Sequence, residues 1–398
     1  MTSAKLSRRQ FIASVSGAAV VSSLATKAWA AEAREGIEQP VQDKKVRIGV
    51  VGGGFGASFH WHEDPNCEVA AVSDLIPERR DNLANRYQCG KTYPSLEELI
   101  KDDTIDAVSV FSGAPDHVRH CVAVMNHGKH CISAVPAAIS LEECEELLEA
   151  KERNGVYYMM AETSYYRWDT ITARRLYEDG KFGELMYSEV EYYHPAIGAG
   201  YDGLSYYQGR RTWRYGYPPM LYPTHSTGFL VGVSRERLTE VSCLGTVGTD
   251  QAFKDNAYNN PFDNQCALFR TDKGHMCRCN VMWNVWNHGE RAQWFGTNLS
   301  LFSEGWSGQP FVIKAREGPD ITTVPDYWSM VPEAMRYDSG HGASHPFLTH
   351  EFIMAILEDR EPAVSVYEAL SITAPGIVAH ESSLRGGEQL KIPSYDKA

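Results

Sequence analysis

The chain has 398 residues, 43% of them hydrophobic and 22% charged, and a formal net charge of −13 at pH 7. This length and composition predict a soluble globular protein with room for two sizeable hydrophobic cores. The negative charge argues against nucleic acids and anionic membranes as partners, because both are bound through clustered positive charge.

The first thirty residues have the pattern of a targeting segment. Ser7–Ile12 (SRRQFI) precedes a mildly apolar stretch, and Ala28-Trp29-Ala30 has the small-x-small pattern of a cleavage site. Paired arginines followed by Phe mark the twin-arginine route, which carries folded proteins. We therefore expect a signal peptide over 1–30 and a flexible lead-in over 31–43. The mature protein is then periplasmic or otherwise exported, without stable membrane insertion; an uncleaved anchor is the alternative.

The next stretch predicts a dinucleotide-binding turn. Val46–Val51 is almost entirely apolar, which is typical of a buried parallel strand. After it comes a match to the G-x-G-x-x-G/A fingerprint, and Ala57–His60 is expected to open a helix whose N-terminus faces the pyrophosphate. A glycine turn that binds no ligand is the alternative. The cofactor contacts expected in this turn are Gly52, Gly54, Phe55, Gly56 and Ala57.

An acid at the end of the second predicted strand strengthens this fingerprint. Glu68–Asp74 is an apolar run that closes on Asp74, twenty residues beyond Gly54. The fingerprint expects a carboxylate there to bind the adenosine ribose, and a carboxylate repels a 2′-phosphate. We therefore expect NAD as the cofactor, while the nearby Arg79 and Arg80 leave NADP as the alternative.

Strands and helices continue to alternate over residues 44–165. Ile105–Phe111, His130–Val135 and Val156–Glu162 are expected to be strands, and Ser95 and Ser140 are expected to cap helices. Such alternation predicts an α/β domain of the Rossmann type, with a parallel sheet whose ligands lie at the carboxyl ends of the strands. Residues near those ends that we expect to contact the cofactor are Ser112, Pro115, His117, Val135, Pro136 and Glu162.

This order of strands resembles the Gfo/Idh/MocA family, the relatives of glucose-fructose oxidoreductase and inositol dehydrogenase. Asp116-His117, Val135–Ala138 and Met159–Glu162 carry the resemblance, which covers nearly the whole mature chain. It implies an N-terminal Rossmann domain and, over 166–398, a C-terminal α/β domain with a large, open, mainly antiparallel sheet. Such sheets often mediate homo-oligomerisation, here to a dimer or tetramer. It also implies a final helix that returns to the Rossmann domain.

Two strings in the second half look like a particular subgroup, the NAD-dependent glycoside hydrolases of the α-N-acetylgalactosaminidase type. They are Tyr192-Tyr193-His194 and Tyr222-Pro223-Thr224-His225. The earlier sequence Val-Pro-Ala-Ala at 135–138 also resembles this subgroup. Typical dehydrogenases of the family carry Glu-Lys-Pro where this chain has Ala134-Val135-Pro136. They often also have an aspartate four residues before the catalytic histidine, where this chain has Leu221. The resemblance implies Glu162, Tyr192, Tyr222 and His225 as site residues.

The chemistry of these side chains favours His225 as the proton-transfer residue. An imidazole titrates near neutrality, so it can take a hydroxyl proton while hydride leaves the same carbon. Tyr192 or Tyr222 can share that role if a neighbouring charge lowers the tyrosine pKa. A purely structural role is the alternative for each of these residues and for Glu162. We expect the substrate to contact Glu162, Trp213, Arg214 and His345.

Metal and disulfide chemistry find little support in the sequence. The nine cysteines are scattered without a C-x-x-C pair, and His60-x-His62 and His117-x-x-His120 lack a third ligand at a suitable spacing. Neither a disulfide framework nor a metal site is therefore expected.

The leading functional hypothesis is an exported NAD-dependent oxidoreductase that acts on a small-molecule carbohydrate. Export favours a tightly held nucleotide, because the periplasm offers little free NAD. One alternative is a redox-neutral glycosidase that oxidises C3, eliminates across C1–C2, adds water and reduces again; the missing lysine favours it. A second alternative is a non-catalytic NAD-containing binding protein, since the usual lysine and aspartate are both absent.

Overall fold

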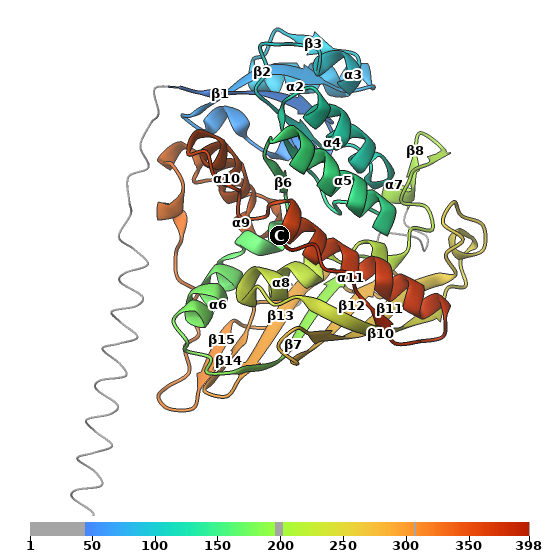
Figure 1. The fold of residues 1–398 in the computed structure, drawn as a ribbon, viewed down its shortest axis with the longest axis vertical. Coiled ribbons are helices and arrows are strands. Elements are labelled where there is room, and N and C mark those ends of the chain that lie inside the picture. The colour runs from blue at the N-terminus through green and yellow to red at the C-terminus, as the bar shows by residue number, and fades with distance from the viewer. Residues whose placement is uncertain (1–43, 196–201, 306–307, 398) are drawn as a thin grey trace, which may run out of the picture.

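A six-stranded parallel sheet forms the N-terminal domain of the computed structural model, which describes residues 44–195, 202–305 and 308–397 (Figure 1). The strand order β3-β2-β1-β4-β5-β6 confirms the predicted Rossmann-type fold. The expected signal peptide and lead-in lie outside the described residues. The strands are β1 (Val46–Val51), β2 (Cys67–Ser73), β3 (Thr92–Tyr93), β4 (Ala107–Val110), β5 (His130–Ser133) and β6 (Tyr158–Met160).

The connecting helices follow the sequence pattern closely after β2. Ser140 caps α5 by accepting a hydrogen bond from the backbone N–H of Glu143, whereas Ser95 makes no side-chain cap to α3. Both serines therefore occupy the expected N-cap positions, but only Ser140 makes a capping hydrogen bond. The helices of this domain are α2 (Pro77–Tyr87), α3 (Leu96–Leu99), α4 (His117–Asn126) and α5 (Leu141–Asn154).

The α-helix expected after the glycine turn is wrong. Two short 3-10 helices, Phe55–Ser58 and Trp61–Glu63, occupy this stretch. Phe59 and Trp61 are both fully buried, with their rings stacked 6.2 Å apart. Residues two positions apart point about 200° apart around an α-helix, so one helical face cannot bury both rings. Burial of the aromatic pair thus outweighs helix formation here.

The C-terminal domain contains a mixed sheet of eight strands in the order β15-β14-β13-β7-β12-β11-β10-β16. Among its described pairs only β7 with β12 is parallel, which confirms the expected large, mainly antiparallel sheet. The strands are β7 (Leu185–Tyr193), β10 (Leu238–Val247), β11 (Phe262–Thr271), β12 (Met276–Met282), β13 (Gly289–Gly296), β14 (Leu299–Phe302), β15 (Val312–Ala315) and β16 (Leu390–Lys391); β8 (Tyr206–Tyr207) and β9 (Arg210–Arg211) form a separate hairpin.

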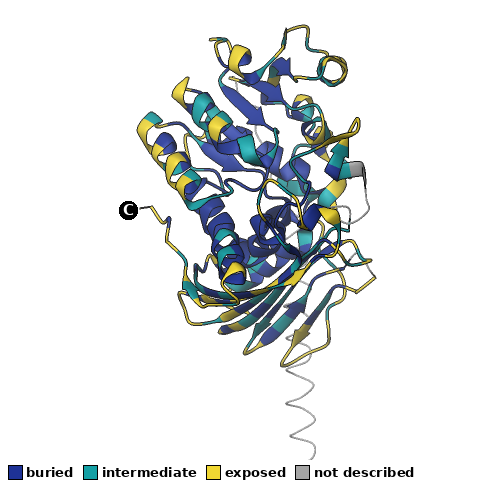
Figure 2. Ribbon diagram, turned by 90° about the vertical axis from the view of Figure 1, so that its right-hand side faces the viewer, coloured by how far each residue is buried: buried dark blue, intermediate teal, exposed yellow. Residues whose placement is uncertain are grey.

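Buried and exposed residues alternate along these strands, so one face of the sheet is covered and the other is open (Figure 2). Helices α8 and α11 pack on the sheet, and α6 packs on α8. The helices of the domain are α6 (Trp168–Glu178), α7 (Asp202–Ser205), α8 (Thr224–Ser234), α9 (Gly340–Ala343), α10 (His345–Leu357) and α11 (Val366–Leu384). No helix in the described part of the chain is long and apolar enough to span a bilayer.

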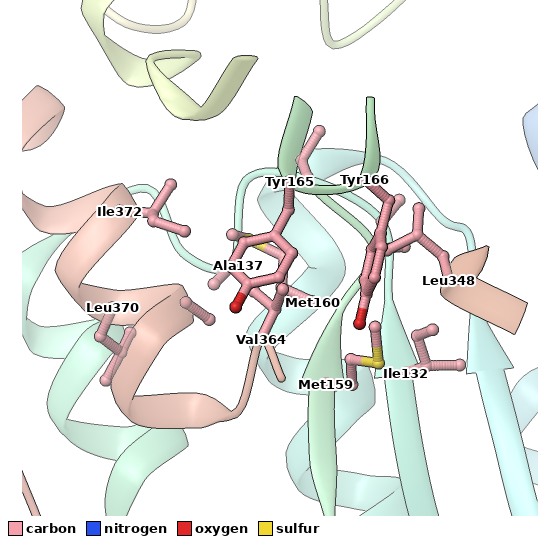
Figure 3. Packing of buried hydrophobic residues seen from close by; sticks show 14 of the residues in the cluster. Ile132, Ala137, Met159, Met160, Tyr165, Tyr166, Leu348, Val364, Leu370 and Ile372 are labelled. Atoms are coloured by element: carbon pink, nitrogen blue, oxygen red, sulfur yellow. The ribbon is translucent and has the colours of Figure 1, made fainter. Parts of the chain in front are cut away.

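The final helix joins the two domains. Helix α11 packs against α5 and β6, and just before it the carbonyl of Val364 accepts a hydrogen bond from the backbone N–H of Met160 at 3.0 Å. The chain therefore returns to the Rossmann domain through its final helix, as expected. Figure 3 shows the shared core at this junction, with Met159 and Met160 of β6 beside Tyr165, Tyr166, Leu348, Val364, Leu370 and Ile372.

Candidate active site

The turn after β1 needs glycine where the chain passes close to the end of β4. Gly52 has φ +101°, and an added Cβ would lie 2.4 Å from the carbonyl oxygen of Phe111. At Gly54 an added Cβ would meet only the guanidinium of Arg79, 3.7 Å away, so the backbone stays open on that side. An open, side-chain-free backbone is what a dinucleotide pyrophosphate requires, so this turn fits the expected cofactor.

Asp74 lies beside this turn at the end of β2. Its carboxylate accepts hydrogen bonds from the backbone N–H groups of Gly53 at 2.6 Å and Ile76 at 2.8 Å. A carboxylate accepts about four hydrogen bonds, so capacity remains for ribose hydroxyls. Arg80 donates to the backbone carbonyl of Asp74, and the guanidinium of Arg79 lies 4.6 Å over the ring of Tyr207. Neither arginine makes a hydrogen bond to the carboxylate, which therefore stays available for the ribose hydroxyls of NAD.

The loops after β4 and β5 are tied together by His117. Its Nδ1 lies 2.7 Å from the carbonyl oxygen of Pro136, and its Nε2 lies 3.0 Å from that of Ser112. The ring is buried with both nitrogens engaged, so His117 ties the two loops together, and its expected cofactor contact stays a prediction. Val135 and Pro136 are buried too, whereas Ser112 and Pro115 remain half-buried at the sheet edge.

Glu162 and His225 form a buried ion pair at the carboxyl end of β6. The Nδ1 atom of His225, in the first turn of α8, lies 2.9 Å from Oε1 of Glu162. The same oxygen accepts hydrogen bonds from the backbone N–H and the hydroxyl of Ser164, at 2.8 and 2.7 Å. This arrangement orients the imidazole through Nδ1 and leaves Nε2 for another partner. Oε2 of Glu162 is buried with no hydrogen-bond partner among the described residues.

The pKa values of the two partners move in opposite directions. Burial by itself raises the pKa of Glu162, but the charge and hydrogen bond of His225, together with Ser164, outweigh it and lower this pKa to about 2. Burial by itself lowers the pKa of His225, but Glu162 and the more distant Glu290 raise it above its ordinary value. The site therefore favours a carboxylate facing an imidazolium.

Two tyrosines flank this pair. The rings of Tyr192, from β7, and Tyr222 lie 4.9 and 5.4 Å from the imidazole of His225. Burial raises the pKa of Tyr192 well above its usual value, with the neighbouring Tyr222 and Glu290 adding to the effect. The expectation that a nearby charge lowers a tyrosine pKa is therefore wrong for Tyr192, which stays a neutral phenol.

An aromatic wall continues from these tyrosines to the N-terminal domain. The indole of Trp213 lies 6.4 Å from the ring of Tyr222, and an added Cβ at Gly113, after β4, would lie 2.7 Å from it. The guanidinium of Arg214 lies 4.2 Å over the Trp213 ring. The structure thus brings Trp213 and Arg214, both expected at the substrate, to the side of the site that faces the cofactor loops.

The rings of His345 and His341 both lie 5.5 Å from the ring of Phe55 in the glycine turn. At the start of α10, His345 is buried under the glycine turn with its ring stacked 4.3 Å from Phe59. It therefore supports the cofactor loop, and the contact expected between His345 and the substrate stays a prediction. The ring of His341 lies 5.7 Å from that of His225 and 5.5 Å from that of Phe55.

A second buried ion pair and a cavity complete the site. Arg167 donates to Oε2 of Glu290 at 2.6 Å, and Glu290 pairs with Tyr192 across β13 and β7. A cavity of about 580 Å³ opens beside Arg167. Its lining includes the perpendicular indoles of Trp168 and Trp328, 5.4 Å apart, together with Asp169, Glu304, Asp338, Gly342 and Ala343.

Comparison with known proteins identifies the N-terminal domain. Residues 46–162 match the Gfo/Idh/MocA model, described as an oxidoreductase family with an NAD-binding Rossmann fold. The nucleotide-binding domain belongs to this family. The expected family and the expected cofactor, NAD, are therefore confirmed, and the glycine turn and Asp74 form the part of a Gfo/Idh/MocA domain that fits the dinucleotide.

Curated relatives and solved structures extend the similarity to the second domain. A glycosyl hydrolase family 109 protein from Solibacter usitatus is 24% identical over 99% of this chain and 98% of its own length. A family 109 protein 1 from Bacteroides thetaiotaomicron is 29% identical over 46% of this chain and 41% of its own length. Levoglucosan dehydrogenase, solved with NADH and L-sorbose, has the same fold, with a TM-score of 0.73 and 17% identity over 88% of this chain and 100% of that one. A putative myo-inositol dehydrogenase from Sinorhizobium meliloti matches over the same shares with a TM-score of 0.68 and 17% identity.

Sequence reasoning missed several residues of the site. Ser164, Arg167 and Glu290 belong to no motif. Ser164 contacts Glu162 as a near neighbour in the chain, whereas only the fold brings Glu290 to Arg167 and Tyr192. His341 lies in the histidine-bearing loop before α10, but histidine type and position alone do not distinguish it from His345. The one usable signal was Glu162 itself, because an acid at the end of a buried strand needs a partner.

Proposed function

We propose that this protein is an exported NAD-dependent oxidoreductase that acts on a sugar or a sugar derivative. The observation that carries the proposal is the Glu162–His225 ion pair, fixed at the carboxyl end of β6. In an open α/β sheet this edge is where ligands bind, and the glycine turn and Asp74 lie at the same edge. A charged acid–histidine pair beside a dinucleotide site supports proton transfer coupled to hydride transfer.

The side chains of the site divide the work by position. Bound NAD supplies the hydride acceptor. Glu162 orients His225 through Nδ1, which turns Nε2 toward a substrate hydroxyl. The rings of Tyr192 and Tyr222 pack against the imidazole and lie 5.9 Å from each other, and their hydroxyl groups donate hydrogen bonds to substrate oxygens. Trp213 closes the site toward the loop after β4 and helps to exclude water.

A carbohydrate substrate is supported by the cavity beside Arg167, the partner of Glu290. Its two indoles offer apolar faces for a sugar ring, and its carboxylates accept hydrogen bonds from hydroxyl groups. The printed names of similar proteins point the same way, since levoglucosan dehydrogenase was solved with a sugar and the curated relatives are named as glycosyl hydrolases.

Nucleotide content and sugar-dependent absorbance test the proposal. The purified mature protein is analysed by mass for co-purifying nucleotide and then mixed with a panel of sugars, with reduction followed at about 340 nm. We expect bound NAD and an absorbance rise with at least one sugar. His225→Asn keeps the nucleotide and abolishes the rise. A protein that neither retains nor takes up a pyridine nucleotide would refute the proposal.

A redox-neutral glycosidase is the second candidate, favoured by two observations. The curated relatives carry the name of glycosyl hydrolase family 109, and the buried Val135 offers no charged group where related dehydrogenases have lysine. A chromogenic glycoside separates the candidates, because the glycosidase releases the chromophore without added NAD or acceptor. A simple dehydrogenase leaves the glycoside intact.

Export is part of the proposal and is carried by the twin-arginine motif at Ser7–Ile12, outside the described residues. Replacing both Arg8 and Arg9 by lysine is expected to retain the protein in the cytoplasm with its nucleotide bound. The wild type is expected in the periplasmic fraction, also with bound nucleotide. Equal distribution of wild type and variant would exclude this route.

Homo-oligomerisation is proposed through the open face of the large sheet. Leu244, Leu268 and Met276 project from neighbouring strands with 64%, 45% and 42% of their surface exposed. Contiguous exposed apolar side chains mark interaction surfaces. Light scattering is expected to give a dimer or tetramer, and Leu268→Glu is expected to shift the mass toward the monomer. A monomeric wild type would reject this assembly.

A further inference from the structure

His341 occupies a backbone conformation that few residues adopt. Its φ is +61°, and the next two residues, Gly342 and Ala343, follow at +64° and +60°. Left-handed backbone is unfavourable for residues with a Cβ and persists where the surroundings impose it, often at functional sites. In this conformation the ring of His341 lies between Phe55 of the glycine turn and the imidazole of His225.

The surroundings of the two histidines differ in charge. His225 has a carboxylate at 2.9 Å, whereas Nδ1 of His341 is buried with no hydrogen-bond partner among the described residues. The charged or titratable groups that act on His341 are His225, Arg167, Glu162, His288 and the adjacent His345, whose ring lies 5.4 Å away. Burial lowers the pKa of His341 to about 3, and the nearby cations add to the effect, so its imidazole is neutral at pH 7.

We infer that His341, and not His225, accepts the proton of the substrate hydroxyl, while His225 is held as a cation that donates a hydrogen bond to the substrate oxygen. The inference rests on the proposed function and names the residue that accepts the proton in it. A base needs a free nitrogen, which His341 has; a cation needs a fixed counter-ion, which Glu162 provides. Gly342 and Ala343 line the cavity, so the loop that carries His341 borders the expected substrate space.

The oxidation step moves one hydride and one proton away from the substrate. The substrate C–H bond breaks and its electron pair leaves with hydrogen as hydride to the nicotinamide of NAD, which is reduced. The O–H proton goes to the imidazole of His341, and the carbon–oxygen single bond becomes a carbonyl. His225 keeps its own proton throughout and stabilises the negative charge that develops on the oxygen.

The sign of the pH dependence distinguishes this assignment from the reverse one. If His341 is the base and His225 the cation, kcat/KM falls as pH rises through the raised pKa of His225. If His225 is the base, kcat/KM increases with pH through that same pKa. The charged groups that act on His225 are Glu162, Glu290 and Arg167, and all three are unchanged in the variants below.

Chemical rescue provides the kinetic test. His341→Gly suits the left-handed backbone, so we expect it to fold and to keep NAD with kcat lowered by about 10²–10⁴-fold. Added imidazoles are expected to restore turnover at rates that increase with the pKa of the added base. His127→Gly, on the exposed end of α4, is the control for imidazole acting elsewhere. Turnover of the His341→Gly variant at the wild-type rate would overturn the inference, as would rescue that ignores the pKa of the base.

A spectroscopic readout separates failure of the inference from failure of the proposed function. Nitrogen NMR of histidine-labelled protein, assigned with His341→Gly and His225→Asn, is expected to show His225 doubly protonated and His341 neutral at pH 7. This result does not require turnover. Signals with the opposite protonation would overturn the inference even if sugar oxidation is found, whereas absent nucleotide would defeat the proposed function alone.

Discussion

Glu162 and His225 keep each other charged in a buried place, and their contributions to stability depend on pH in opposite ways. The carboxyl pKa is lowered from 4.5 to about 2, so its contribution is complete above 4.5 and is lost as pH falls toward 2. The imidazole pKa is raised from 6.5, so its contribution is complete below 6.5 and is lost as pH rises through the raised value. The pair therefore stabilises the fold most between pH 4.5 and 6.5.

Removing the carboxylate charge tests this coupling. Glu162→Gln leaves His225 without its counter-ion, and we expect the free energy of unfolding near pH 6 to fall by about 3–5 kcal/mol. The pH dependence that the pair gives to urea unfolding should be lost with it. Glu98→Gln, in an exposed pair with Lys101, is the matched control and should leave the midpoint unchanged. Equal effects of the two substitutions would show that burial does not strengthen the pair.

Gly54 allows nucleotide binding to be tested apart from folding. An added methyl meets nothing nearer than 3.7 Å, so we expect Gly54→Ala to change the stability little. The same methyl would stand where the pyrophosphate must approach, so we expect Gly54→Ala to weaken NAD binding by about tenfold or more. Calorimetric titration measures the affinity and thermal unfolding the stability. Gly90→Ala, in open space, should change neither.

The residues of the site differ in how far the sequence could predict them. Gly52, Gly54 and Asp74 belong to a fingerprint whose spacing follows from phosphate and ribose geometry, so sequence suffices to propose them. Glu290 reaches Tyr192 only through the antiparallel register of β7 and β13, which are almost a hundred residues apart in the chain. No local pattern contains that register. The same holds for the choice between His341 and His345, which the backbone of the α9 turn decides.

At the scale of elements, the match between sequence and structure depends on whether packing agrees with local propensity. Helix α5 has a cap, a charged outer face and a glycine stop, and it forms as predicted. The stretch after β1 has the signals of a helix start, but two aromatic side chains at i and i+2 must both be buried, and packing prevails. Intrinsic helix propensity therefore predicts local structure poorly where large side chains must be buried in positions that a helix does not allow.

The two predicted caps make a matched pair for measurement. Ser140 accepts a backbone hydrogen bond at 3.2 Å, and Glu143 returns one by accepting from the N–H of Ile139 at 2.7 Å. We expect Ser140→Ala to lower the free energy of unfolding by about 1 kcal/mol, because the backbone N–H of Glu143 loses its acceptor. Ser95→Ala removes no cap to the backbone of α3 and should cost much less. Urea midpoints of the two variants are measured side by side. An equal loss of stability in both would contradict the conclusion that only Ser140 makes a stabilising cap.

At the scale of the whole molecule, the site exists only because the two domains are fixed to each other. The cofactor turn lies in one domain and His225, Tyr192 and His341 in the other, so any slack at the junction would separate hydride and proton transfer. Helix α11 spans the junction on one side. On the other side of the junction, Asp64 follows the second 3-10 helix of the N-terminal domain. Its Oδ2 lies 2.8 Å from Nδ1 of His350 in α10, and both side chains are buried.

This contact predicts that the domains unfold together. His350→Phe keeps a ring of similar size but leaves the Asp64 carboxylate buried without its partner, so we expect a loss of about 3–5 kcal/mol. Because the pair crosses the junction, the loss should appear equally in release of NAD from the N-terminal domain and in tryptophan fluorescence, to which Trp283 and Trp294 of the C-terminal domain contribute beside Trp61. His127→Phe, on the exposed end of α4, should leave both transitions in place. If NAD release and fluorescence change at different urea concentrations already in the wild type, the domains are independent and the junction does not hold the site together.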